Sequence, residues 1–180
     1  VEPRIAFRDI PPDFKLPKKW GDVKKYYVVE NDVRNQLLIE NTKKLLELGR
    51  KPLILFRDIK HGRILEEMLP SGIRYEMVTG ALSMDERERI KSQFKAGKLD
   101  LVLASSVFDQ GIDLPALDAL ILAGGGKSTA KALQRIGRVI RAAPGKTNAL
   151  VLETWDQSHF VKKHSSARYE AYRLESKFKI

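Results

Sequence analysis

The stretch PLILFRDIKHGRILEEMLPSGIRYEMV, residues 52–78, sets the expected fold of this chain. PLILF (52–56) is a short apolar run without alternation, which is typical of a strand buried on both faces of a parallel sheet. A helix is expected over about 60–69, and YEMV (75–78) is expected as the next strand. Strands separated by helices favour right-handed crossovers and a parallel sheet.

The same alternation continues toward the C-terminus. A helix begins at SMDE, where Ser83 and Glu86 have capping-box spacing, and Gly97 ends it. The remaining elements expected there are strands at 100–104, 118–123 and 148–153 and helices at 128–141 and 159–176.

Toward the N-terminus, KYYVVE (25–30) is a β-type run. The segment NDVRNQLLIENTKKLLELG (31–49) is helical, with Asn31 or Asp32 as the N-cap and Gly49 as the C-cap. The fold class is therefore three-layer α/β, a central, mostly parallel sheet with helices on both faces. Ligands of such sheets bind at the carboxyl ends of the strands, so the residues after each strand are the candidates for function.

Residues 1–23 differ from the rest of the chain. They carry Pro3, Pro11, Pro12 and Pro17, which disfavour a long helix or a central strand. We expect an extended arm or linker over 1–23 and one folded domain over 24–180.

Composition narrows the class of protein. The 180 residues fit one domain, and 43% hydrophobic with 31% charged residues is typical of a soluble globular chain. The apolar runs are far shorter than the ~20 residues that span a bilayer, so no membrane partner is expected. The chain has no cysteine, which excludes disulfides and thiol sites, and its three histidines lack metal-ligand spacing, so no metal ligands are expected.

The net charge of +10 indicates a polyanionic partner, most often a nucleic acid. The alternative is a surface that is basic only for solubility.

The loop AGGGKST (123–129) lies between a strand and a helix, as a phosphate-binding loop does. It fails the Walker A spacing, because the position five residues before Gly126 is Ile121, inside the strand. Lys127 and Ser128 at a helix N-terminus still form a plausible anion contact. The alternative is a turn with Ser128 as an N-cap.

The strongest local signal is QRIGRVIR (134–141). On a helix, Arg135, Arg138 and Arg141 share a face, while Ile136, Val139 and Ile140 bury the other side. Guanidiniums held in this way suit a transferring phosphoryl group. The alternative is a basic helix that contacts a nucleic-acid backbone or solvent.

QRIGRVIR resembles motif VI of superfamily 2 helicases, and LVLASSVFDQGIDLP (101–115) resembles their motif V. PLILFRDIKHGRILEEML (52–69) resembles motif IV, and VTGALSMDERERIKSQFKAGKLD (78–100) resembles the block between motifs IV and V. The four ordered blocks are most similar to the phage branch-migration helicases of the UvsW type. The resemblance implies the second RecA-like domain of a two-domain motor, and host cytoplasm as its location if the protein is phage-encoded.

The resemblance implies that ATP with Mg²⁺ binds between this domain and an N-terminal RecA-like domain of the same chain. Arg138 and Arg141 match the motif VI arginines that reach the γ-phosphate, and Gln134 matches a polar residue near the attacking water. Gly111 and Asp113 match motif V residues near the nucleotide; their alternative is a turn that leaves a strand. Arg135 matches a structural ion-pair position.

The resemblance also implies a DNA partner, contacted through its backbone. The candidate contacts follow the expected strands: Arg57, His61, Thr79, Gly80, Ser105, Ser106, Lys127 and Ser128. Such contacts position the nucleic acid without reading its sequence.

The sequence lacks two motifs of the family, which limits the activity expected of the 180 residues alone. It has no Walker A motif and no DEXH-type quartet, since DERE (85–88) begins a capped helix. We expect the 180 residues alone neither to hydrolyse ATP nor to unwind DNA. Two alternatives to a helicase remain open: a double-stranded DNA translocase and a stand-alone nucleic-acid-binding module. A P-loop kinase is disfavoured because the glycine-rich loop fails the Walker A spacing.

The segment 157–180 is expected as a basic C-terminal helix. Its interleaved aromatic and basic residues could stack on bases. The favoured interpretation is that one face packs on the sheet, formed by Phe160, Ala167, Ala171 and Leu174.

Overall fold

The computed structural model describes residues 1–12, 19–80, 82–105, 114, 116–124, 128–139 and 141–180, with backbone only at 129, 130, 138, 139 and 159. The described strands are β1 (Glu2–Ile10), β2 (Pro52–Leu55), β3 (Tyr75–Val78), β4 (Leu101–Ala104), β5 (Ala119–Leu122) and β6 (Asn148–Asp156). The described helices are α1 (Trp20–Val23), the π-helical segment η1 (Lys24–Val29), α2 (Asp32–Glu47), α3 (Ile59–Glu67), α4 (Met84–Lys95), α5 (Thr129–Val139) and α6 (His159–Arg173).

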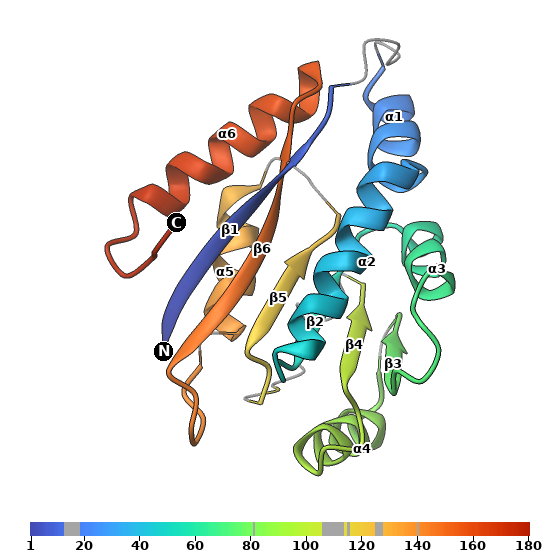
Figure 1. Cartoon of the computed structure of the whole chain (residues 1–180), viewed down its shortest axis with the longest axis vertical. Helices are drawn as coiled ribbons and strands as arrows, with labels where there is room; N and C mark the ends of the chain where they lie inside the picture. Colours follow the sequence, from blue (N-terminus) through green and yellow to red (C-terminus); the bar gives the residue numbers. More distant parts are fainter. Residues whose placement is uncertain (13–18, 81, 106–113, 115, 125–127, 140) are drawn as a thin grey trace.

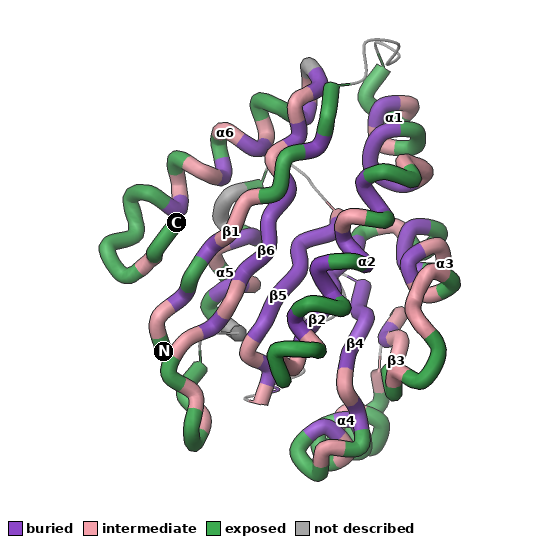
Figure 2. The backbone as a smooth tube through the Cα atoms, in the orientation of Figure 1, coloured by how far each residue is buried: buried purple, intermediate pink, exposed green. Residues whose placement is uncertain are grey.

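The strands form one sheet in the order β1-β6-β5-β2-β4-β3, and the described pairs of neighbours are parallel (Figure 1). Every residue of the three central strands β2, β4 and β5 is buried, as their continuous apolar runs predict (Figure 2). The expected parallel α/β sheet is therefore confirmed.

Helices cover both faces of the sheet. Leu38 of α2 and Leu65 of α3 pack with Ile54 and Ile121 in a core on one face. On the other face, Phe94 of α4, Ile136 of α5 and Tyr172 of α6 share a core with strand residues such as Leu53 and Leu120. The two cores make the three layers predicted from the sequence.

Residues 2–10 do not form an arm or linker. They are strand β1, which pairs with β6 from Glu2 opposite Asn148 to Ile10 opposite Asp156. Pro3 is compatible with this strand because β1 lies at the edge of the sheet. The C-terminal tail partly covers that edge, since Ile5 N donates to Lys179 O at 2.7 Å.

The expected strand at KYYVVE is also wrong, because residues 25–29 lie in η1, which continues α1 and ends before Glu30. Burial of Tyr27, Val28 and Val29 stabilises the helical form. Tyr27 and Val28 pack in a small core with Ile10 and Val161, so tertiary packing overrides the β-propensity of the run.

Helix ends follow the sequence signals closely. Asn31 accepts a hydrogen bond from Arg34 N at 2.9 Å, and Ser83 and Glu86 form the expected capping box. Gly49 and Gly97 follow their helices with φ of 70° and 68°, a conformation that glycine adopts without strain.

The packed face of α6 differs from the expectation. Its buried side chains are Val161, Ser165, Arg168 and Tyr172, whereas Leu174 is 81% exposed. The register was missed because two polar residues, Ser165 and Arg168, occupy positions on the buried face.

Candidate functional site

The carboxyl ends of β2, β3 and β4 bring several predicted contacts to one edge of the sheet. Backbone hydrogen bonds extend beyond the strands: Phe56 N donates to Ala104 O at 3.0 Å, and Ser105 N donates to Val78 O at 2.9 Å. Arg57, Thr79 and Ser105 therefore each follow a strand end at this edge.

The predicted DNA contacts at this edge differ in how far they are exposed to solvent. Arg57 and Gly80 are exposed, and Gly80 has φ of 78°. Thr79 is half-buried. Ser105 is only 3% exposed, so its hydroxyl lies inside the fold and does not present a surface contact to DNA.

Arg57 lies across the end of the neighbouring strand β5. A Cβ atom at Gly124 would lie 2.8 Å from Arg57 Cγ and 3.1 Å from Arg57 N, so the missing side chain makes room for the arginine. Arg57 and Gly124 line one small cavity together with Ser128, Lys131 and Arg135. The structure thus brings two predicted DNA contacts, Arg57 and Ser128, to one cationic cavity at the N-terminus of α5.

His61 is corrected from a DNA contact to a buried structural residue. Its side chain is 1% exposed, and Nε2 lies 2.9 Å from Asn35 Oδ1. Burial, followed by the nearby positive charge of Arg34, lowers the pKa of His61 to about 3. The imidazole is therefore neutral at physiological pH and cannot contribute a charge to a phosphate contact.

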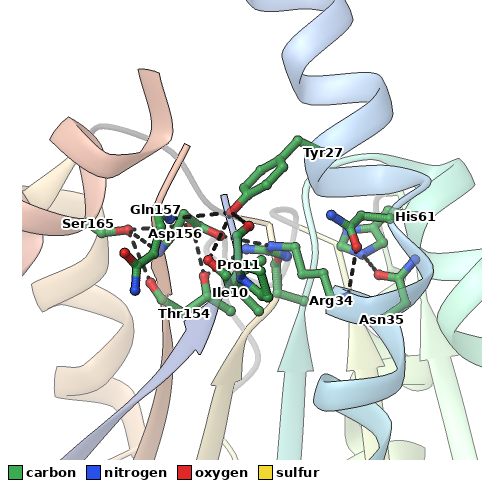
Figure 3. A network of polar contacts seen from close by, with 12 residues as sticks. Ile10, Pro11, Tyr27, Arg34, Asn35, His61, Thr154, Asp156, Gln157 and Ser165 are labelled. Atoms are coloured by element: carbon green, nitrogen blue, oxygen red, sulfur yellow. Dashed lines mark hydrogen bonds and ion pairs between the residues drawn. The ribbon is translucent and has the colours of Figure 1, made fainter. Parts of the chain in front are cut away.

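A buried polar network joins α2 to the ends of β5 and β6 (Figure 3). Arg34, which is fully buried, donates to Ala123 O at 2.6 Å, to Thr154 Oγ1 at 2.8 Å and to Asp156 Oδ1 at 3.2 Å. Tyr27 extends the network by donating to Pro11 O at 2.9 Å. The network fixes the backbone just before the glycine-rich loop.

Sequence reasoning missed this network, although one signal was present. Arg34 precedes Leu38 by four residues and Leu45 by eleven, so it lies on the apolar stripe of α2. An arginine on such a stripe indicates a buried ion pair, but its partner on β6 cannot be read from the helix.

A second buried cluster lies between β6 and α6. Arg168 Nε lies 3.0 Å from Glu153 Oε2, and Tyr172 donates its hydroxyl to the same oxygen at 2.8 Å. Burial, followed by the Glu153 charge, raises the pKa of Tyr172. Arg168 and Tyr172 are thus part of the core, and the predicted base-stacking alternative for the tail does not apply to them.

Helix α5 carries the QRIGRVIR stretch against the sheet. Ala132 and Ile136 are buried, Arg135 is half-buried and Gln134 is exposed. Burial of Ile136 agrees with the predicted apolar side, whereas the side chains of Val139 and Ile140 lie outside the described atoms. Arg141 is exposed just beyond its end. Arg138 lies in the helix, but its side chain is outside the described atoms.

Four predicted site residues lie outside the described residues: Ser106, Gly111, Asp113 and Lys127.

The described residues include no group of three His, Cys, Asp or Glu side chains that could hold a metal ion. Among the predicted nucleotide-binding residues, Gln134 and Arg141 are described. Their side chains carry hydrogen-bond donors, which fit a nucleotide phosphate better than a metal ion. Within the described part of the chain, no helix is long and apolar enough to cross a membrane.

Comparison with known proteins agrees with this geometry. Residues 34–143 match the family model described as the helicase conserved C-terminal domain. The chain is 33% identical over 112 residues to the DNA 3'-5' translocase XPB2 of Sulfurisphaera tokodaii, which covers 61% of this chain and 24% of that relative. It is 27% identical over 143 residues to the ATP-dependent DNA helicase uvsW of Enterobacteria phage T4, covering 78% and 28%. The chain spans about a quarter of the length of these relatives.

The crystal structure of T4 UvsW superposes on the chain with a TM-score of 0.79 at 22% identity, over 99% of this chain and 41% of that one. This likeness confirms the RecA-like fold that the sequence predicted.

Proposed function

Because the chain belongs to the helicase conserved C-terminal domain family, we propose that it is the second motor domain of an ATP-dependent superfamily 2 DNA helicase. The observation that carries the proposal is α5, which buries Ala132 and Ile136 and leaves Gln134 exposed beside the arginines of QRIGRVIR. This domain would bind ATP in a cleft shared with a first RecA-like domain, which would hold most of the Mg²⁺ ligands.

On the nucleotide side, Arg138 and Arg141 would act as arginine fingers that stabilise the charge developing on the γ-phosphate. Such fingers contribute roughly 10³ to 10⁵ in rate in phosphoryl-transfer enzymes. Gln134 would orient the attacking water. Gly111 and Asp113 would approach the nucleotide, the Asp113 carboxylate accepting hydrogen bonds from ribose hydroxyls.

On the nucleic-acid side, Arg57, Thr79, Gly80 and Ser128 would contact the DNA backbone. Their support is their position at the carboxyl ends of parallel strands, together with the cationic cavity that Arg57 and Ser128 share. Ser106 and Lys127 would extend this track. We leave His61 and Ser105 out of this track because both side chains are buried.

Closing of the cleft would move this domain along one DNA strand relative to the first, and hydrolysis would reopen it. Identity to the ATP-dependent DNA helicase uvsW supports DNA as the substrate. The resemblance of the four motif blocks to branch-migration helicases leads us to propose branched DNA in particular, in replication, recombination or repair.

In the full-length protein, Arg138→Ala and Arg141→Ala are each expected to lower DNA-stimulated ATP hydrolysis about 10³-fold. DNA affinity, measured by fluorescence anisotropy, should change less than about threefold. The control is Arg173→Ala, since Arg173 is an exposed arginine that pairs with Glu170 one turn away in α6. Loss of DNA affinity with hydrolysis retained would favour a non-catalytic binding module and contradict the motor assignment.

A second candidate is a double-stranded DNA translocase, which the identity to the archaeal translocase favours. It makes the same prediction for the two arginines. Strand-displacement assays separate the candidates, because a translocase hydrolyses ATP on duplex DNA without releasing single strands.

A further inference from the structure

A large hollow lies at the end of the sheet opposite the proposed DNA track, where β2 and β5 begin. It has a volume of about 690 Å³ and lies between α4, the segment that leads into β5, and residues 143–146 before β6. In Figure 1, α4 and the turn before β6 both lie at the lower end of the molecule. The proposed DNA contacts follow the upper ends of the strands, so they do not account for this hollow.

Four lysines surround the hollow: Lys51, Lys91, Lys95 and Lys146. Asp118 is the one acidic residue among its described lining residues, and its carboxylate already accepts from Lys51 N at 2.7 Å and Arg50 Nη1 at 3.4 Å. The wall of the hollow therefore carries a surplus of positive charge.

The lysines of α4 are the ones available to a partner. Lys51 and Lys146 donate their ammonium groups to the carbonyls of Phe94 and Leu117. Lys91 and Lys95 lie one helical turn apart and are exposed, and Lys91 lies 3.4 Å from the exposed Glu88. An exposed pair of this kind is weak, so it would yield to a better anion.

The hollow also has an apolar lining, here called its floor, to which Leu114, Ala116, Ala143, Pro144 and the buried Phe94 contribute. DNA could use only the lysines here, because its phosphates cannot pack on the apolar lining and no exposed aromatic side chain among the described lining residues could stack on a base. The volume is that of a pocket for a few side chains, too small for a duplex. An apolar floor with a lysine rim instead suits a peptide that carries an apolar side chain between carboxylates.

We propose that this hollow, the lysine groove, binds an acidic segment of a partner protein, with Lys91 and Lys95 contacting its carboxylates and the floor receiving an apolar side chain. Leu114 lies at the end of the motif V stretch (101–115), and Ala143 lies two residues beyond the motif VI stretch (134–141). A bound segment would therefore contact both stretches where they leave the motor chemistry.

The test uses two fluorescein-labelled peptides of equal charge, DDLFDD and DDSSDD, with the 180-residue chain in fluorescence anisotropy. DDLFDD is expected to bind at least about fivefold more tightly than DDSSDD, because only it can fill the apolar floor. Lys91→Gln with Lys95→Gln should weaken DDLFDD binding at least about fivefold. The matched control, Lys162→Gln with Lys163→Gln, removes two exposed charges from α6 and should change binding less than about twofold.

A variant that leaves the charges intact tests the floor. Ala143→Phe should weaken the binding of DDLFDD and leave any weak binding of DDSSDD unchanged, because the phenylalanine ring would occupy the hollow. Ala143 lies in a loop, so the larger side chain should not disturb a helix or strand. Equal binding of the two peptides, no binding of DDLFDD, or no effect of the α4 double variant would overturn the proposal. Competition by a short DNA duplex that depends on Lys91 and Lys95 would also overturn it, and would assign the groove to nucleic acid.

Discussion

The guanidinium of Arg34 in α2 donates a 2.6 Å hydrogen bond to the carbonyl of Ala123 at the end of β5. Ala123 is the residue before the glycine-rich loop that leads into α5. The same guanidinium pairs with Asp156, which is 1% exposed, at the end of β6. One buried side chain thus joins three elements next to Gly124, which lines the cavity that Arg57 and Ser128 share.

Arg34→Met is expected to lower the free energy of unfolding by about 3 to 5 kcal/mol, because it leaves the Asp156 carboxylate buried without its cation. Urea denaturation followed by circular dichroism measures the change. The control Arg63→Met removes an exposed arginine that pairs with Glu66 within α3, and should cost less than about 1 kcal/mol.

The double variant Arg34→Met, Asp156→Leu should recover part of that loss, since it removes the uncompensated charge. A loss below about 1 kcal/mol for Arg34→Met alone would show that the ion pair does not hold these elements together.

The sequence predicted the alternation of elements because apolar runs and caps are local signals. It missed β1 because the prolines disfavour only a central strand, and nothing in residues 1–23 indicates the edge position at which a strand tolerates Pro3. It missed η1 because Tyr27 and Val28 have high β-propensity, and only their packing against Ile10 and Val161 stabilises the helical form. Both errors arise from contacts between residues distant in the chain.

The sequence predicted where the candidate site residues lie on the sheet, but not which of their side chains are exposed. Arg57, Thr79 and Ser105 follow strand ends, and parallel strands place those ends at one edge. Nothing local in the sequence distinguishes exposed Arg57 from buried Ser105 or His61, because the residues that cover them come from other elements. The partner of His61, for example, is Asn35 of α2.

Burial of His61 should make stability depend on pH in mildly acidic solution. Because its folded-state pKa of about 3 lies below the unfolded value of about 6.5, the unfolded chain binds a proton that the folded chain does not. This contribution to stability is complete above pH 6.5 and is lost progressively as pH falls toward 3. Lowering the pH from 7 to 5 should therefore reduce the free energy of unfolding by about 2 kcal/mol through His61.

The measurement compares urea denaturation of the wild type and His61→Gln at the two pH values. The variant should lack this component, whereas carboxylates such as Asp58 titrate in both proteins. An identical pH dependence in the two proteins would mean that His61 is not buried in the neutral form.

Tyr172→Phe should destabilise the fold by about 1 to 3 kcal/mol, because it removes a hydroxyl that donates to the buried Glu153 carboxylate at 2.8 Å. Tyr169→Phe is the matched control. Tyr169 packs its ring against Phe7 and Trp155, so removing its hydroxyl keeps those contacts and should cost less than about 0.5 kcal/mol. Equal melting temperatures for the two variants would argue against a structural role for the Tyr172 hydroxyl.

Gly124 should matter for DNA binding through Arg57. Gly124→Ala would place a methyl group 2.8 Å from Arg57 Cγ and 3.1 Å from Arg57 N, so the arginine must move from its place beside Ser128. We expect the affinity of the chain for labelled single-stranded DNA to fall about fivefold, as for Arg57→Ala, since both lose one phosphate contact. The combined variant should bind no more weakly than Arg57→Ala, because the two changes act on the same side chain.

The control for this prediction is Gly137→Ala in α5, where a Cβ atom would have no described atom outside the helix's own backbone within 4 Å. It should leave DNA affinity unchanged and stabilise the helix by up to about 1 kcal/mol, because alanine loses less backbone entropy than glycine. Gly124→Ala must also keep the circular dichroism spectrum of the wild type for its DNA affinity to be interpreted. Additive losses in the combined variant would show that Gly124 acts independently of Arg57, and unchanged affinity in Gly124→Ala would show that Arg57 can leave this position without weakening the DNA contact.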